Sequence, residues 1–91
     1  IAIIGCGFSG TMVMAHVAAR ASGPLSVLML DASPHAGLGP AYATPRPEHL
    51  LNVRAGRMSA WPERPADFVD WCAAEGRPLA PEAFAPRALY G

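Results

Sequence analysis

The chain has no lysine and no excess of charge of either sign. All seven of its basic residues are arginine, seven acidic residues balance them, and the formal net charge at pH 7 is +0. A neutral chain lacks the basic surface that attracts nucleic acid or an anionic membrane, so we expect neither as a partner. Arginine without lysine, in a chain rich in alanine and proline, is typical of a GC-rich bacterial genome.

Cysteine and long hydrophobic runs are also scarce. Cys6 and Cys72 form neither a CxxC pair nor a disulfide framework, which favours a reducing, cytoplasmic environment. No apolar run reaches the roughly 20 residues that a membrane-spanning helix needs. The three histidines lack the spacing of a metal site, so no metal ion is expected.

The residues that are present indicate part of one globular domain. The 91 residues are 52% hydrophobic and 15% charged, with a mean hydropathy of +0.22. The chain opens inside an apolar run and stops abruptly at Tyr90-Gly91. We therefore interpret residues 1–91 as the N-terminal part of a domain that belongs to a longer chain.

The first 31 residues have the pattern of a βαβ unit. Residues 1–4 (IAII) are a short apolar run bounded by glycine, which is typical of a strand buried on both faces of a parallel sheet. Residues 9–21 predict a helix that Ser22-Gly23-Pro24 stops. Residues 25–31 (LSVLMLD) predict a second strand. Such a unit places its two strands parallel.

Three glycines at the GxGxxG spacing lie between the first strand and the helix. In this context the pattern predicts a phosphate-binding turn. Gly5 allows the tight turn, Gly7 lets backbone approach a pyrophosphate, and Gly10 lets helix and strand pack closely. The helix N-terminus offers N–H groups and partial positive charge to the phosphates, and Ser9 adds a hydroxyl.

Asp31 ends the second predicted strand, 21 positions after Gly10. A carboxylate there accepts hydrogen bonds from ribose hydroxyls and repels a 2′-phosphate, and no arginine follows in residues 32–35. NADP is therefore disfavoured at this site. The alternative is a structural glycine turn followed by a solvated aspartate.

Residues 33–65 leave the α/β pattern in a long, irregular, proline-rich excursion. Such a stretch is uncommon unless it is functional, and this one has the length to wrap a cofactor longer than NAD, such as FAD. The residues leave two alternatives open, an NAD-dependent dehydrogenase domain and a non-catalytic dinucleotide-binding module. Arg54, Arg57 and Arg64 lie in the excursion, and we expect them on the solvated surface.

The last third of the chain is less informative. Residues 65–76 predict a helix that begins at Pro65 and ends at Gly76. Phe68, Trp71 and Cys72 share one face of this helix, which predicts that all three belong to the core. Residues 77–91 have the composition of a proline-broken connector.

Five motifs occur in order along the chain, namely GCGFSG, LMLD, GLGPAY, HLLNVRAGRMSAWPERPADFVDW and FAPRALYG. Together they resemble the N-terminal FAD/NAD(P)-binding segment of a bacterial flavoprotein family that includes FAD-dependent urate hydroxylase-like and aspartate N-monooxygenase-like proteins. The resemblance covers essentially all 91 residues. The chain departs from the family's pattern at Arg54, which replaces a proline, and at Asp31, where many members have glutamate.

The fold class expected on these grounds is α/β, a Rossmann-like FAD/NAD(P)-binding βαβ unit with a long irregular excursion, in an incomplete domain. The resemblance implies a flavin-dependent, monooxygenase-like oxidoreductase with FAD as cofactor and a small-molecule substrate. NAD(P)H would be the co-substrate, bound mainly outside these residues. In such chemistry the cofactor carries the reaction, and no residue of this chain is assigned as a catalytic acid, base or nucleophile.

The resemblance also implies a set of cofactor-binding residues. They are Gly5, Gly7, Phe8, Ser9, Gly10, Asp31, His35, Gly39, Asn52 and Met58. The three glycines of the turn, with Phe8 and Ser9, would hold the FAD pyrophosphate, and Asp31 would bind the adenosine ribose. His35 and Gly39 would lie along the cofactor. Asn52 and Met58 would lie near the flavin.

Overall fold

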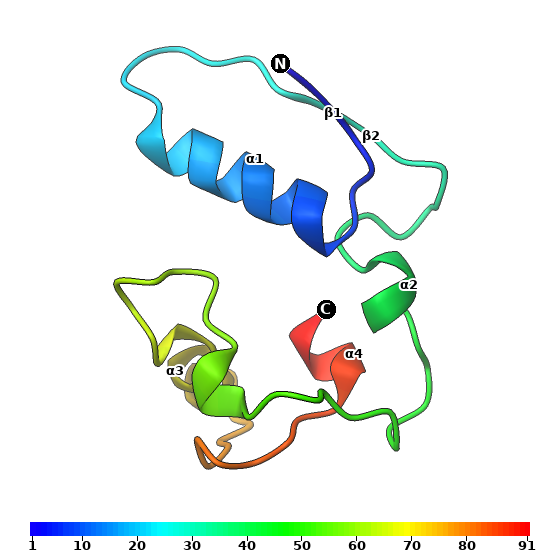
Figure 1. Ribbon diagram of the computed structural model, residues 1–91, viewed down its shortest axis with the longest axis vertical. Coiled ribbons are helices and arrows are strands. Elements are labelled where there is room, and N and C mark those ends of the chain that lie inside the picture. The colour runs from blue at the N-terminus through cyan, green and yellow to red at the C-terminus, as the bar shows by residue number, and fades with distance from the viewer. The chain divides into compact units, whose positions relative to one another are not determined.

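The computed structural model describes residues 1–91, which divide into two compact units (Figure 1). Unit 1 comprises residues 1–43 together with Gly91, and unit 2 comprises residues 44–90. The chain contains a two-stranded parallel sheet, four α-helices and one 3-10 turn. None of the helices combines the length and the apolarity that crossing a membrane would need.

Unit 1 contains the predicted βαβ arrangement. Strand β1 (Ala2–Ile4) leads into helix α1 (Phe8–Arg20), and strand β2 (Leu28–Leu30) follows. The two strands run parallel, with Ala2 opposite Leu28 and Ile4 opposite Leu30. The Gly5 N–H donates to the Leu30 carbonyl at 2.7 Å, which continues the pairing past the end of β1. The parallel strand–helix–strand prediction is therefore confirmed.

The strands differ from the prediction in length and in burial. Strand β2 is shorter than the predicted residues 25–31, since its ladder with β1 covers only Leu28–Leu30. The prediction that the strands are buried on both faces is wrong, since Ile4 is 87% exposed and Leu28 is 58% exposed. The physical reason is that the sheet has only two strands and α1 runs along one side of the pair (Figure 1).

Unit 1 also contains a short helix, α2 (Gly39–Tyr42), with proline in its first turn. It is a single turn within the excursion that the sequence predicts to be irregular. The aromatic ring of Tyr42 meets that of Phe8 edge to face, with centroids 6.0 Å apart. Unit 1 therefore brings the start of α1 together with residues 37–42, the second glycine-containing segment of the unit.

Unit 2 is organised by an antiparallel pairing between segments that the sequence shows only as loops. The N–H of Leu51 donates to the Ala85 carbonyl at 2.8 Å, and Leu50 forms a bridge with Pro86. The same alignment continues to the 3-10 turn η1 (Ala55–Arg57), whose first N–H donates to the Ala83 carbonyl at 2.8 Å. Residues 77–91, predicted as a connector, thus supply half of this pairing and end in helix α4 (Arg87–Tyr90).

Helix α3 (Asp67–Ala74) lies within the predicted residues 65–76 and supplies much of the core of unit 2. Phe68 is 7% exposed and Cys72 is fully buried, as predicted. Burial raises the pKa of the Cys72 thiol, which stays protonated as a packing group. The prediction that Trp71 is a core residue is wrong, because Trp71 is 47% exposed and its ring stacks on that of Phe68.

Gly76 ends α3, as the sequence predicts. It adopts φ +72°, a left-handed conformation that favours glycine. Its N–H donates to the Ala73 carbonyl at 3.1 Å, and the next N–H, of Arg77, donates to the Cys72 carbonyl at 2.8 Å. This pair of bonds is a Schellman motif, which satisfies the carbonyls at the helix end.

Candidate functional site

The glycine turn between β1 and α1 has the geometry that its spacing predicts. Gly5 adopts φ +93° at the end of β1. A Cβ atom on Gly10 would overlap the Gly5 carbonyl oxygen and would lie 3.3 Å from Cγ2 of Ile3. Helix and strand therefore approach so closely that only glycine fits at position 10.

Gly7 packs against the second glycine-containing segment. A Cβ atom on Gly7 would lie 3.5 Å from the Cα atom of Gly39, and one on Gly39 would lie 3.1 Å from the Cα atom of Gly7. Gly39 itself adopts φ +57°. Gly7 is predicted to let a pyrophosphate approach because it has no side chain. For the same reason, the backbone of Gly39, another predicted site residue, can pack against it.

The N-terminus of α1 has the features of an anion-binding helix end. Gly7 is the N-cap, no side chain caps the helix, and its first turn contains no acidic residue. The first N–H groups of an α-helix have no partner within the helix, and they carry its partial positive charge. Ser9 is exposed beside them. This donor set fits a pyrophosphate, which is negatively charged and accepts hydrogen bonds.

Asp31 follows β2 and ties the end of that strand to the glycine turn. One carboxylate oxygen, Oδ1, accepts from the Ser33 N–H at 2.7 Å, and the other, Oδ2, accepts from the Cys6 N–H. These backbone donors, that of Ser33 first, hold the pKa of the exposed Asp31 carboxyl below its ordinary value. Each oxygen keeps further acceptor capacity, so the ionised group can still bind a ribose hydroxyl.

The residues after Asp31 fold back onto the same turn. The N–H of His35 donates to the Ser33 hydroxyl at 3.1 Å, and the His35 side chain is exposed. The N–H of Gly37 donates to the Cys6 carbonyl, with φ +93° at Gly37. The predicted site residues up to Gly39 are therefore gathered in unit 1 around one turn.

The remaining predicted residues, Asn52 and Met58, lie in unit 2. Asn52 is exposed and lines a groove beside η1. Met58 follows η1 directly, is half-buried, and donates its N–H to the Ala55 carbonyl at 3.1 Å. Their proximity to a flavin therefore stays a prediction.

Sequence reasoning missed the structural roles of Cys6 and Ser33. Cys6 forms its hydrogen bonds through its backbone N–H and carbonyl. Bonds of this kind cannot be predicted from the type of residue. The contact to Ser33 had a recognisable signal in Asp31, because aspartate side chains typically accept from the backbone N–H two residues later in a turn. No three His, Cys, Asp or Glu side chains are grouped so that they could hold a metal ion.

Comparison with known proteins agrees with this geometry. A family model described as FAD-NAD(P)-binding matches residues 2–91, which is nearly the whole chain and includes both units. No curated protein and no solved structure gives a match.

Proposed function

The chain belongs to the FAD-NAD(P)-binding family, and from this membership we propose that it binds FAD as part of a flavin-dependent oxidoreductase. The observation that carries the proposal is the uncapped N-terminus of α1, placed directly behind a parallel strand by the glycine turn. That membership alone relates the chain to dinucleotide-binding oxidoreductases. The choice of FAD over NAD is supported by the long excursion of residues 33–65 and by the motifs that resemble flavoproteins.

The pyrophosphate of FAD would be held by the start of α1. The N–H groups of the first turn donate to phosphate oxygens, and the exposed Ser9 hydroxyl adds another donor. Gly5 sets the sharp turn that aims these groups, and Gly10 keeps α1 close to β1. Binding here needs backbone groups rather than charged side chains.

The adenosine ribose would be held by Asp31. Its carboxylate is kept ionised and oriented by two backbone N–H groups, so it is ready to accept from ribose hydroxyls. The same negative charge disfavours a 2′-phosphate at this position. His35 and Gly39 would lie along the cofactor, and Asn52 and Met58 near the flavin, as the resemblance implies.

The reaction that we propose is monooxygenase-like. Bound FAD supplies the redox chemistry, with NAD(P)H as the reductant and a small molecule as substrate. NAD(P)H and the substrate would be bound mainly by residues outside 1–91. The role of the present residues is to bind and orient the cofactor.

The first test is the visible spectrum of the intact protein, followed by release and identification of any bound cofactor. FAD in a one-to-one ratio supports the proposal, and NAD(P)H-dependent oxygen consumption then tests the monooxygenase-like reaction. Bound NAD without flavin, even after incubation with FAD, would replace it with a dehydrogenase. Absence of both would leave a glycine turn with a structural role only.

A further inference from the structure

Unit 2 contains an open groove with two well-defined walls. Residues 52–57 form one wall, residues 81–84 form the other, and the groove has a volume of about 680 Å³. The walls are joined by backbone hydrogen bonds of 2.8 Å from Ala55 to Ala83 and from Gly56 to Pro81. A Cβ atom on Gly56 would lie only 3.0 Å from the Pro81 side chain. The close contact and the hydrogen bonds fix the separation of the walls.

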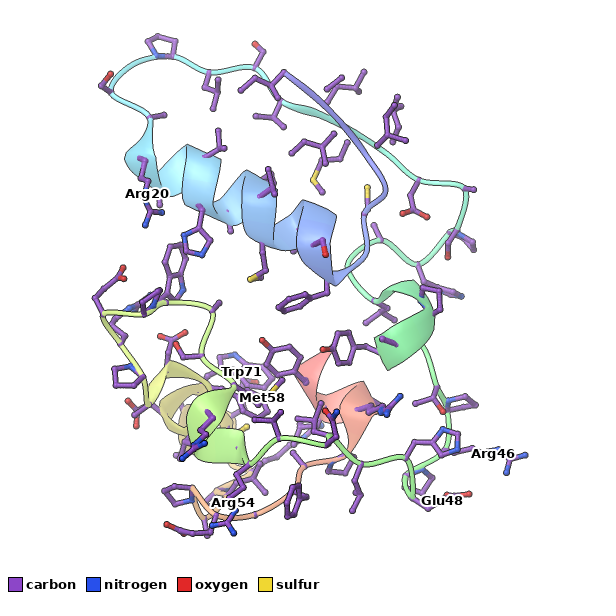
Figure 2. The ribbon with its side chains drawn as sticks, viewed as in Figure 1. Arg20, Arg46, Glu48, Arg54, Met58 and Trp71 are labelled. Atoms are coloured by element: carbon purple, nitrogen blue, oxygen red, sulfur yellow. The ribbon has the colours of Figure 1, made fainter.

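The first wall carries two arginines without a carboxylate partner. Arg54 precedes η1 and Arg57 is its last residue, and both side chains line the groove. Both ion pairs of the chain are formed by other arginines. Figure 2 shows Arg54 at the periphery of unit 2. The guanidinium donors of Arg54 and Arg57 therefore remain available to a ligand.

The opposite wall adds one negative charge and one aromatic ring. Glu82 lines the groove without forming an ion pair with either arginine, so a net positive charge remains. Phe84 also lines it, with 48% of its surface exposed. A guanidinium pair beside an open ring suits a small organic anion better than an inorganic ion alone, because the ring can cover apolar atoms.

We propose that this groove binds the oxyanion group, carboxylate or phosphate, of a small organic molecule through Arg54 and Arg57. The planar guanidinium group donates two parallel hydrogen bonds, which matches the oxygens of either anion. Phe84 covers the apolar part of the same molecule. Both arginines are exposed, as the sequence predicts, and the proposal adds a ligand for their guanidinium groups.

The test is an anion titration of the full chain in which binding is monitored by the NMR signal of the Gly56 amide, in the first wall. Sodium phosphate and sodium acetate are added separately, with sodium chloride keeping the ionic strength constant. We expect saturable shifts at Gly56, and the anion that binds more tightly identifies the ligand class. R54Q and R57Q should each weaken binding about 5- to 10-fold, as expected for loss of a charged donor.

Two further variants make the test specific. E82Q removes the opposing charge and should strengthen binding about 2- to 3-fold, which is the size of a screened surface interaction. R20Q, in α1 of unit 1, is the matched control and should leave the affinity unchanged. Shifts that do not saturate, or that R54Q and R57Q leave unaltered, would overturn the proposal.

The groove shares one lining residue, Asn52, with the residues proposed to lie near the flavin, so a repeat of the titration with FAD present tests whether the two sites are separate. Unchanged phosphate or acetate binding supports a distinct groove, and displacement by FAD would overturn it by assigning the groove to the cofactor. A chain that binds no FAD but binds the anion in the first titration would refute only the proposed function.

Discussion

Unit 1 carries the predicted phosphate-binding turn with almost no hydrophobic core, whereas unit 2 has a core and carries no glycine turn. The buried hydrophobic residue of unit 1 is Cys6, and those of unit 2 are Leu51, Ala55, Phe68, Cys72 and Ala85. Unit 1 is held by backbone hydrogen bonds and by glycines in close contact. The difference shows that the shape of the turn is set by its backbone rather than by packing beneath it.

This comparison predicts that different kinds of substitution destabilise the two units. Unit 2 should be sensitive to the loss of apolar volume, because its core is small and each side chain is a large share of it. Unit 1 should be sensitive to added volume at its glycines and to loss of the Asp31 charge. Large apolar side chains of its strands are already exposed, among them Ile4 and Leu28.

The largest effect is expected from Phe68→Ala in unit 2. Phe68 is 7% exposed and meets the Tyr90 ring edge to face at 5.0 Å. Truncation should lower the free energy of unfolding by about 3–5 kcal/mol, because a cavity is left in a tightly packed site. The measurement is hydrogen exchange of the α3 amides in the full chain.

Trp71→Ala is the matched control for Phe68→Ala. Trp71 lies on the same helix, stacks on Phe68, and is 47% exposed. Its truncation should cost about 1 kcal/mol, the size of an aromatic pair at a surface. Equal losses of protection in the two variants would contradict the assignment of Phe68, and not Trp71, to the core.

The next largest effect is expected from Gly10→Ala in unit 1. The added Cβ would overlap the Gly5 carbonyl oxygen, so α1 must shift away from β1. Such overpacking costs about 3 kcal/mol, and the shift should also move the N–H donors that we propose hold the pyrophosphate. We expect weaker FAD binding, measured by flavin fluorescence.

Gly23→Ala is the control, because nothing lies within 4 Å of a Cβ atom there. It should leave FAD affinity and stability nearly unchanged. If Gly10→Ala behaved like Gly23→Ala, the close contact between α1 and β1 would not be what shapes the turn.

A pH dependence is expected from Asp31. The folded pKa lies below the ordinary value of 3.8 because Ser33 and Cys6 donate to the carboxylate. The stabilisation is therefore complete above pH 3.8 and is lost as the pH falls through the lower, folded pKa. The measurement is the chemical shift of the Cys6 and Ser33 amides, which should change together in that acidic range.

Asp31→Asn should abolish this titration, since the amide has one acceptor oxygen for two donors and no charge. FAD affinity should fall about 10-fold with the loss of a charged acceptor. Asp70→Asn, on α3 of unit 2, is the control and should leave both amide shifts unaltered. If the amide shifts of Cys6 and Ser33 still changed at acidic pH in Asp31→Asn, a group other than Asp31 would be responsible for the titration.

The same contrast explains how far the sequence is informative. Most of unit 1 could be predicted from the sequence. Its strands, its glycine spacing and Asp31 lie within one short stretch that has regular patterns. The exposure of its strands could not be predicted, because it depends on what covers the sheet and not on the residues of the strands themselves. The hydrogen bond from the Cys6 N–H to Asp31 also cannot be predicted from residue type, because every residue except proline supplies a backbone N–H.

The structure of unit 2 depends on contacts between segments that are far apart in the sequence. The pairing of residues 50–56 with residues 81–86 joins two irregular segments that have no period of their own. Helical spacing puts Phe68 and Trp71 on one face, yet Phe68 is buried and meets the Tyr90 ring near the end of that pairing, whereas Trp71 is 47% exposed. The groove beside Arg54 also arises from the pairing, so sequence reasoning could assign that arginine only to the surface.

The smallest effect is expected from Gly76→Ala at the end of α3. Gly76 has φ +72° and nothing within 4 Å of a Cβ atom, so alanine introduces backbone strain without a clash. Strain of this kind costs about 1 kcal/mol for an L-residue, well below the loss expected from Phe68→Ala. Chemical denaturation should show this reduction, and Gly76→Asn should recover part of it because asparagine tolerates the left-handed conformation. No difference between the alanine and asparagine variants would mean that α3 ends through its carbonyl bonds alone, whatever residue occupies position 76.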